Sequence, residues 1–253
     1  AAGVAVIRAA HARIAPHVLR TPVMSCRALD AAVGATLWFK CENFQDVGAF
    51  KARGAANAVF SLTEAEAARG VVTHSSGNHG AALAYAARQR GIAAWVVMPE
   101  NSAKVKQDNV RRFGATIRFC APNIPAREAL CAEVLAETGA TMIHPFDDPR
   151  VIAGQATAAL ELLETHPDLD IVIAPVGGGG LLSGTAIAAR SLKPAPPLPM
   201  PAPGKVTVNV LNTTFRTGLA STVAAEVRTR GFRVAHVGND PTRLKVLYTF
   251  SRL

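Results

Sequence analysis

The chain has 253 residues, of which 49% are hydrophobic and 18% are charged. This balance is ordinary for a globular protein and excludes a mainly disordered chain. No stretch approaches the ~20 uninterrupted apolar residues that cross a bilayer, which excludes a helical membrane protein. His11, Arg13 and His17 interrupt the apolar residues of the first twenty positions, so we expect no signal peptide and a cytoplasmic protein.

The four cysteines are Cys26, Cys41, Cys120 and Cys131. None of them forms a CxxC pair, and no histidine lies near them at the spacing of a zinc site. We therefore expect four reduced thiols and no metal ligands among them.

The formal charge of +9 is concentrated at the end of the chain. Residues 204–253 contain eight basic and two acidic residues, a net charge of +6. Such a tail is found on proteins that bind nucleic acid or anionic surfaces. It contains no base-reading motif and few aromatic residues, so a solvated cationic face is the favoured interpretation and nucleic-acid binding the weaker one.

Short apolar runs alternate with alanine-rich helical stretches up to about residue 193. The predicted strands are 36–40, 71–74, 94–98, 116–120 and 171–175. The predicted helices are 54–61, 80–90, 103–113, 127–138 and 154–165. This order predicts an α/β fold with right-handed crossovers and a mostly parallel sheet, whose ligands bind at the carboxyl ends of the strands.

Six prolines fall within residues 194–203 and predict a semi-rigid linker. Beyond it, residues 205–211 alternate as a strand, 213–229 are predicted to form a helix, and 232–237 and 244–250 two more strands. We therefore expect a catalytic region at 1–193, a linker at 194–203, and a small basic βαβ-like module at 204–253.

The first motif that carries chemistry is Gly48-Ala49-Phe50-Lys51-Ala52-Arg53-Gly54. It places a lysine just ahead of a helical run, where a partly desolvated amine can form a Schiff base. Taken alone, the fragment is more typical of a solvated lysine at a helix start.

The second motif runs from Thr73 to Gly80 (THSSGNHG), directly after a predicted strand and before a helix. One polar residue suffices to cap a helix, whereas this loop has several in a row. The free N–H groups and the positive dipole end of the helix favour a carboxylate or phosphate there.

The third motif is Gly177-Gly178-Gly179-Gly180-Leu181, again between an apolar strand and a helix that we expect to begin near Ser183. Consecutive glycines let backbone N–H groups converge on a phosphate. The loop lacks both the lysine of a Walker loop and the spacing of a dinucleotide site, which disfavours ATP and NAD. Two such loops and a lysine together indicate pyridoxal 5′-phosphate as the cofactor.

These motifs, in this order, resemble the fold-type II (tryptophan synthase β-like) pyridoxal-phosphate enzymes. Residues of about 5–193 resemble the serine racemase and serine/threonine dehydratase branch. Further matching stretches are Thr21-Pro22, 40–45 (KCENFQ), 144–149 (HPFDDP) and 152–155 (IAGQ). The resemblance implies two domains, the smaller one covering about 50–145.

The resemblance also implies roles for individual residues. Lys51 would form the Schiff base with the cofactor and act as the base at the substrate Cα, while Phe50 would position the ring and Asn78 would bind its oxygen. The substrate carboxylate would be held by Ser75, Ser76, Gly77 and His79. The phosphate would be bound by Gly177, Gly178, Gly179, Gly180 and Leu181.

The implied activity is the dehydration of L-serine, L-threonine or a similar β-hydroxy amino acid to a 2-oxo acid and ammonia. Ser76 keeps racemisation open, because racemases of this branch use a serine at that position as the acid or base on the opposite face. Family members are commonly dimers, so the resemblance allows a homodimer acting on a small-molecule substrate.

The resemblance ends at the proline run. The strands, divalent-cation ligands and ring-nitrogen partner that the family carries beyond this point are not found in the sequence. Residues of about 204–242 instead resemble the C-terminal domain of LytR-type cell-envelope proteins, through Val206–Asn212, Gly218–Ala220 and Arg230–Phe232. The alternative to an active enzyme is therefore a catalytically impaired cofactor-binding remnant joined to an interaction module, and a truncated sheet predicts an unpaired edge.

Overall fold

The computed structural model describes residues 2–192, 207–212, 233–239 and 247–252, with five further helical positions between 221 and 229. The helices are α1 (Ala2–Ile14), α2 (Arg27–Val33), η1 (Glu42–Phe44), η2 (Asp46–Gly48), α3 (Lys51–Phe60), α4 (Glu64–Arg69), α5 (Asn78–Arg90), α6 (Lys104–Arg111), α7 (Ile124–Thr138), α8 (Pro149–Thr165) and α9 (Gly180–Leu192). The strands are β1 (Val23–Met24), β2 (Phe39–Lys40), β3 (Val71–His74), β4 (Ala94–Pro99), β5 (Thr116–Cys120), β6 (Thr141–Met142), β7 (Ile171–Val176), β8 (Thr207–Asn212), β9 (Arg233–Asn239) and β10 (Leu247–Arg252).

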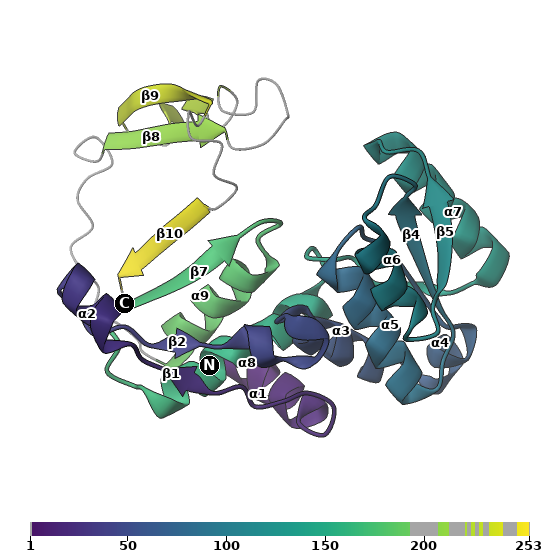
Figure 1. Cartoon of the computed structure of the whole chain (residues 1–253), viewed down its shortest axis with the longest axis horizontal. Helices are drawn as coiled ribbons and strands as arrows, with labels where there is room; N and C mark the ends of the chain where they lie inside the picture. The colour runs from purple at the N-terminus through teal and green to yellow at the C-terminus, as the bar shows by residue number, and fades with distance from the viewer. Residues whose placement is uncertain are drawn as a thin grey trace.

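A parallel sheet of order β5-β4-β3-β6 forms one part of the molecule (Figure 1). Its strands alternate between two cores: Val71 and Val96 pack toward α3, α5 and α6, while Val72 and Val97 pack toward α7. Since both faces are covered, the central strands are apolar on both sides, as expected for a parallel sheet with crossover helices.

A second part is built on α8. Helix α1 packs against α8 and α9 through Ile7, Leu160 and Ala188, and β7 packs its Val172 against Leu163 and Ala189. Helix α3 also packs on α8, and so connects this part with the helices that cover the sheet.

The α/β organisation predicted from the sequence is confirmed, and strands β3 and β5 have the predicted bounds. Three differences matter for the site. Helix α3 begins at Lys51 itself, α9 begins at Gly180 rather than near Ser183, and β2 is only two residues long. The short strand β6 has no counterpart in the sequence prediction, because two residues carry no periodicity.

The described parts of the tail include two paired strands and one that returns to the main body. Strands β8 and β9 pair in parallel, as the predicted βαβ-like unit requires. Strand β10 pairs antiparallel with β7 over six residues, from Leu247 opposite Val176 to Arg252 opposite Ile171 (Figure 1). One edge of β7 is thus paired with β10, so the unpaired edge expected from the sequence is not found on this side of β7. The predicted linker at 194–203 lies outside the described residues.

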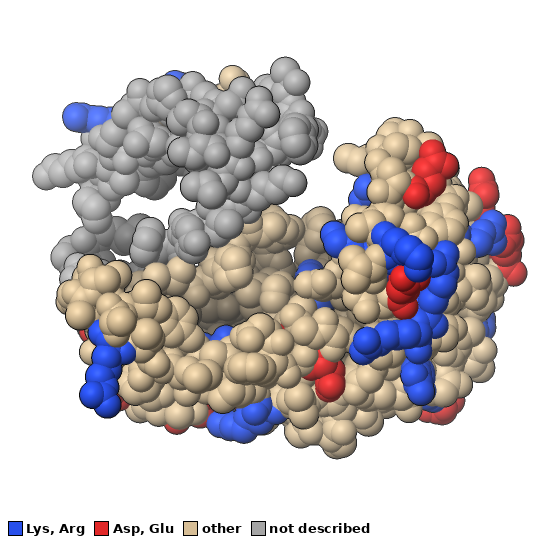
Figure 2. Space-filling model, viewed as in Figure 1, with Lys and Arg blue, Asp and Glu red and all other residues tan. Residues whose placement is uncertain are grey.

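Basic side chains gather on the unit that contains α5 and α6 (Figure 2). The exposed ones there are Arg88, Lys104, Lys106, Arg111 and Arg112. Most of the basic tail lies outside the residues whose side chains are described. All four cysteines are free. Among the described helices, none combines the length and apolar character needed to cross a bilayer.

Candidate active site

Lys51 is the first residue of α3, and its amine points back along the helix to the segment after β6. Nζ donates a hydrogen bond of 2.6 Å to the carbonyl oxygen of Pro145. The Phe50 ring lies 5.3 Å from the same nitrogen. Burial lowers the pKa of Lys51 from 10.5 to about 8. The structure therefore holds this amine in a partly desolvated place, which is the condition for a nucleophilic lysine.

The loop between β3 and α5 carries the second motif. The Ser75 N–H donates to Val97 O, and the Ser75 hydroxyl accepts from the Gly77 N–H at 3.2 Å. Gly77 precedes α5 with no side-chain cap, so the first N–H groups of the helix stay available. The side chains of Ser76 and Asn78 are exposed. A Cβ at Gly77 would meet no atom within 4 Å, so open space lies over this loop.

His79 lies apart from its loop neighbours. Its side chain is 2% exposed, and Nε2 faces the carbonyl oxygen of Ile143 at 3.4 Å. Burial, helped by the nearby charge of Lys51, lowers the pKa of His79 to about 3, so the ring is neutral at ordinary pH. What His79 presents to the loop is its backbone N–H in the first turn of α5. Its Nδ1 is buried without a hydrogen-bond partner.

The four glycines at 177–180 alternate between open space and close packing. A Cβ on Gly178 would lie 2.2 Å from the Phe146 ring, and one on Gly180 would lie 2.9 Å from the Phe146 carbonyl oxygen. Gly177 and Gly179 face open space instead, and Gly179 has a φ of +89°, which favours glycine. The loop therefore presents bare backbone on one side and packs on Phe146 with the other, directly at the start of α9.

Residues 143–146 bring the three motifs together. Within this segment Ile143 faces the His79 ring, Pro145 accepts from Lys51, and Phe146 packs under Gly178 and Gly180. His144 fixes its local shape, because its Nδ1 accepts hydrogen bonds from the N–H groups of Phe146 and Asp147 at 3.4 and 2.8 Å. From the sequence, residues 144–149 are identified only as a stretch that matches the family, with no role assigned to them.

A buried ionic network behind Lys51 was also missed. Arg53, two residues along α3, is fully buried between Glu42 and Glu161. The only sequence signal for this network was the polar run at 40–45. The second carboxylate that binds Arg53, Glu161, lies 108 residues after it in the chain. Periodicity cannot reveal a contact at such a separation.

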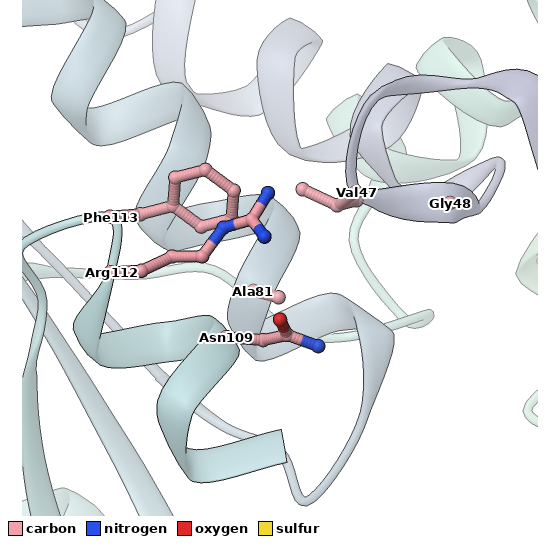
Figure 3. Close-up of a pocket in the computed structure, with 6 residues that line it drawn as sticks. All are labelled: Val47, Gly48, Ala81, Asn109, Arg112 and Phe113. Atoms are coloured by element: carbon pink, nitrogen blue, oxygen red, sulfur yellow. The ribbon is translucent and has the colours of Figure 1, made fainter. Parts of the chain in front are cut away.

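One cavity lies beside the site rather than in it. It has a volume of about 270 Å³ and is lined by Val47, Gly48, Ala81, Asn109, Arg112 and Phe113. Figure 3 shows the Arg112 side chain next to the Phe113 ring and pointing toward the Val47–Gly48 turn. The cavity shares only Gly48, the first residue of the lysine motif, with the three motifs, and neither Lys51 nor the two loops line it. Among the described residues no cluster of three His, Cys, Asp or Glu could hold a metal ion.

Comparison with known proteins decides the family. The model of the family described as pyridoxal-phosphate dependent enzyme matches residues 14–246. The chain belongs to this family. Its match extends past the proline-rich stretch into the tail.

Two relatives are more than 50% identical to the matched part of the chain. The β-hydroxyaspartate dehydratase of Paracoccus denitrificans is 55% identical over 186 residues, which cover 74% of this chain and 59% of that protein. The serine racemase of Oryza sativa subsp. indica is 52% identical over 195 residues, which cover 77% and 58%. The chain thus spans about three fifths of the length of these relatives.

Solved structures of the family share the fold. Serine racemase from Dictyostelium discoideum superposes with a TM-score of 0.72 at 48% identity, covering 75% of this chain and 62% of that one. Threonine deaminase isoform 2 from Solanum lycopersicum gives a TM-score of 0.74 at 27% identity, covering 94% and 62%. The predicted fold-type II architecture is therefore confirmed.

The residues present fit pyridoxal phosphate. The cofactor needs an amine for its aldehyde, and Lys51 provides one whose lowered pKa leaves part of it neutral at pH 7 to 8. It also needs a seat for a phosphate, and the open backbone of Gly177 and Gly179 lies at the N-terminus of α9. Open space over Gly77 leaves room for a ligand at the N-terminus of α5.

Proposed function

We propose that the protein catalyses the pyridoxal-phosphate-dependent dehydration of L-serine, L-threonine or a related β-hydroxy amino acid to a 2-oxo acid and ammonia. The observation that carries this proposal is the desolvated amine of Lys51, held against the segment that also supports the glycine loop. The names of the relatives, a β-hydroxyaspartate dehydratase and serine racemases, support the same substrate class.

Each motif has a defined part in this proposal. When bound, pyridoxal phosphate supplies an aldehyde for amines and an electron-withdrawing ring for the substrate Cα. Lys51 would hold the cofactor and act as the base at the substrate Cα, for which a pKa of about 8 is well matched. Phe50 would lie beside the ring, and Asn78 would donate to its oxygen. The N–H groups of Gly177, Gly178, Gly179, Gly180 and Leu181 would hold the phosphate.

The substrate carboxylate belongs at the start of α5. Ser75, Ser76 and Gly77 line this loop, and His79 contributes its backbone N–H because its ring is buried. Two free helix N–H groups and a hydroxyl suit a carboxylate better than any neutral group. The amine and the β-hydroxyl of the substrate then extend toward Lys51.

Racemisation is the second candidate, and Ser76 is the observation that favours it. Ser76 is exposed in the open loop, and in this role its hydroxyl would return a proton to Cα from the side opposite Lys51. Ser76→Ala should then reduce D-serine formation at least tenfold while pyruvate formation changes little. If Ser76→Ala lost D-serine and pyruvate formation equally, Ser76 would not be the residue that reprotonates Cα.

For the chain as a whole, the proposed division is a catalytic region at 1–193, with the smaller unit at about 50–145, a linker at 194–203, and a LytR-like module at 204–253. The parallel sheet of residues 71–142 supports the smaller unit, and the parallel pair β8–β9 supports a βαβ-like module. A homodimer and a cytoplasmic location complete the proposal.

The test is a visible absorption spectrum of the full chain with pyridoxal phosphate, before and after L-serine. We expect an absorption band that shifts with L-serine and disappears in Lys51→Ala. Lys104→Ala is the matched control, because that lysine is exposed and forms an ion pair with Asp108 on the same helix. Pyruvate and ammonia are then assayed with serine, threonine and 3-hydroxyaspartate. A soluble chain with no Lys51-dependent band would instead support the cofactor-binding remnant.

A further inference from the structure

The Arg53 guanidinium is the centre of the buried network. Its exposed fraction is 0%, and it forms paired hydrogen bonds with two carboxylates. Nε and Nη2 donate to Glu42 at 2.8 and 2.9 Å, and Nη1 and Nη2 donate to Glu161 at 2.8 and 2.9 Å. Two further acceptors, Thr157 Oγ1 and the Leu19 carbonyl, lie at 3.1 and 3.3 Å. This fork geometry is specific to arginine.

The network is close to neutral and joins distant elements. Lys40 donates to Glu161 at 2.6 Å and to the Thr21 carbonyl at 2.7 Å, and the Thr21 hydroxyl donates to Glu42 at 2.6 Å. Two basic and two acidic side chains therefore balance one another in a buried place, and the His11 ring lies 3.3 Å from Glu161. Loosening one member of such a buried set leaves a charge poorly paired, which is strongly unfavourable.

The network fixes the first turn of α3, in which Lys51 is the first residue. Arg53 is the third residue of this helix, and Glu161 lies on α8. The contact between the two helices is tight beside it, because a Cβ on Gly154 would lie 2.5 Å from the Arg53 carbonyl oxygen. The Gly54 N–H donates to the Gln155 side chain at 3.3 Å. The first turn of α3 is thus bound to α8 through both side chain and backbone.

The same turn is held from the other side through Lys51 itself. Its amine donates to Pro145, four residues before α8 begins. The glycine loop packs on Phe146, the next residue. A shift of the first turn of α3 relative to α8 would therefore move the amine away from both its acceptor and the glycine loop.

We infer that Arg53, which is hydrogen-bonded to Glu161 and Glu42, is a positioning residue. It holds the Lys51 amine in its desolvated place beside the glycine loop. This inference rests on the proposed function only in taking Lys51 as the reactive amine. The network does not touch that amine, so its effect is transmitted through the first turn of the helix.

Two substitutions test this without changing any charge. Arg53→Lys keeps the cation but loses the paired fork, and Glu161→Asp keeps the anion but shortens its reach. Both should let α3 shift and admit water to Lys51. The pKa of Lys51 should then rise from about 8 toward 10.5. A rise of one unit is a roughly tenfold smaller neutral fraction at pH 7.

The measurement is the pH dependence of trace acetylation of Lys51, quantified by mass spectrometry on the full chain without cofactor. Arg90→Lys is the matched control, since Arg90 holds the other end of α3 through the carbonyls of Val59 and Leu62. It should lower the melting temperature and leave the Lys51 titration unchanged.

The inference is overturned if both network variants melt lower while Lys51 titrates as in the wild type, because the network would then be structural only. It is also overturned if Arg90→Lys shifts the titration equally. Circular dichroism identifies any variant that fails to fold, and Glu161→Asp carries the test if Arg53→Lys does so. Because no cofactor is present, the result is independent of whether the chain turns over a substrate.

Discussion

Gly154 of α8 lies directly against Gly54 of α3, so that a Cβ on Gly154 would be 2.6 Å from the Gly54 Cα and 2.5 Å from the Arg53 carbonyl oxygen. Backbone atoms cannot move aside as the end of a side chain can. Gly154→Ala should therefore push the two helices apart and lower the free energy of unfolding by about 1–3 kcal/mol, the usual cost of overpacking. Urea unfolding of the full chain measures this.

Gly3→Ala serves as the control for that substitution. Gly3 is also helical, but its nearest neighbours are the side-chain atoms of Ile187 and Ser191, at 2.9 and 3.2 Å. These can adjust, and alanine favours the helix by up to about 1 kcal/mol. Equal destabilisation by the two alanines would show that the close approach of α3 and α8 is not the cause.

The two sides of the glycine loop should respond differently to an added methyl group. Gly178→Ala collides with the Phe146 ring and should lower the melting temperature of the chain without cofactor. Gly177→Ala enters open space, so the melting temperature should stay unchanged while pyridoxal phosphate binds about tenfold more weakly, a loss of roughly 1.4 kcal/mol. Thermal melts and a cofactor titration separate the two effects, and identical melts would contradict the packing on Phe146.

The buried amine of Lys51 should lower the stability of the folded chain. Its pKa is about 8 in the folded chain against an ordinary 10.5, so the unfolded chain binds more protons between these values. Stability therefore rises as the pH rises from about 8 to 10.5, and below 8 the burial cost is fully present. Lys51→Met should raise the free energy of unfolding at pH 7 by about 1–3 kcal/mol, which allows for the lost bond to Pro145.

Urea unfolding at pH 7 and pH 9.5 provides the measurement. The advantage of the methionine variant should shrink at the higher pH, where the wild-type amine is largely neutral. A gain that is independent of pH would mean that the amine is not desolvated in the folded chain.

His79 should contribute to acid sensitivity. Its pKa is lowered to about 3 from 6.5, so the unfolded chain binds more protons between those values and stability falls as the pH drops through this window. His79→Asn should lose less stability than the wild type between pH 7 and 4.5, by about 2 kcal/mol. Denaturant unfolding at both values tests this, and parallel losses would show that the ring is protonated in the folded state.

Local sequence pattern singled out the parts of the proposed site that are contiguous in the chain. The loop at Ser75–His79 and the glycines at 177–180 each stand between a strand and a helix, and Lys51 begins a helix. The strands β3 and β4 were equally clear, because both of their faces are apolar.

What the sequence could not predict depends on tertiary neighbours. The burial of His79 follows from the packing of its ring against Ile143, which a loop motif does not reveal. The role of Pro145 lies in a backbone carbonyl, which carries no residue preference. The pairing of β10 with β7 joins segments more than seventy residues apart, so the tail was expected to stand alone.

The buried network around Arg53 also constrains the order in which the chain is completed during synthesis. Lys40, Glu42 and Arg53 emerge from the ribosome early, and Glu42 can pair with Arg53 at once. Glu161 follows Lys40 by 121 residues. Until it appears, both cations lack the carboxylate that they share, and sealing α3 into an apolar interior would bury an unbalanced charge. The N-terminal segments must therefore stay hydrated until α8 has been made, and a fragment that ends before residue 161 is a poor choice for isolating the lysine-bearing half.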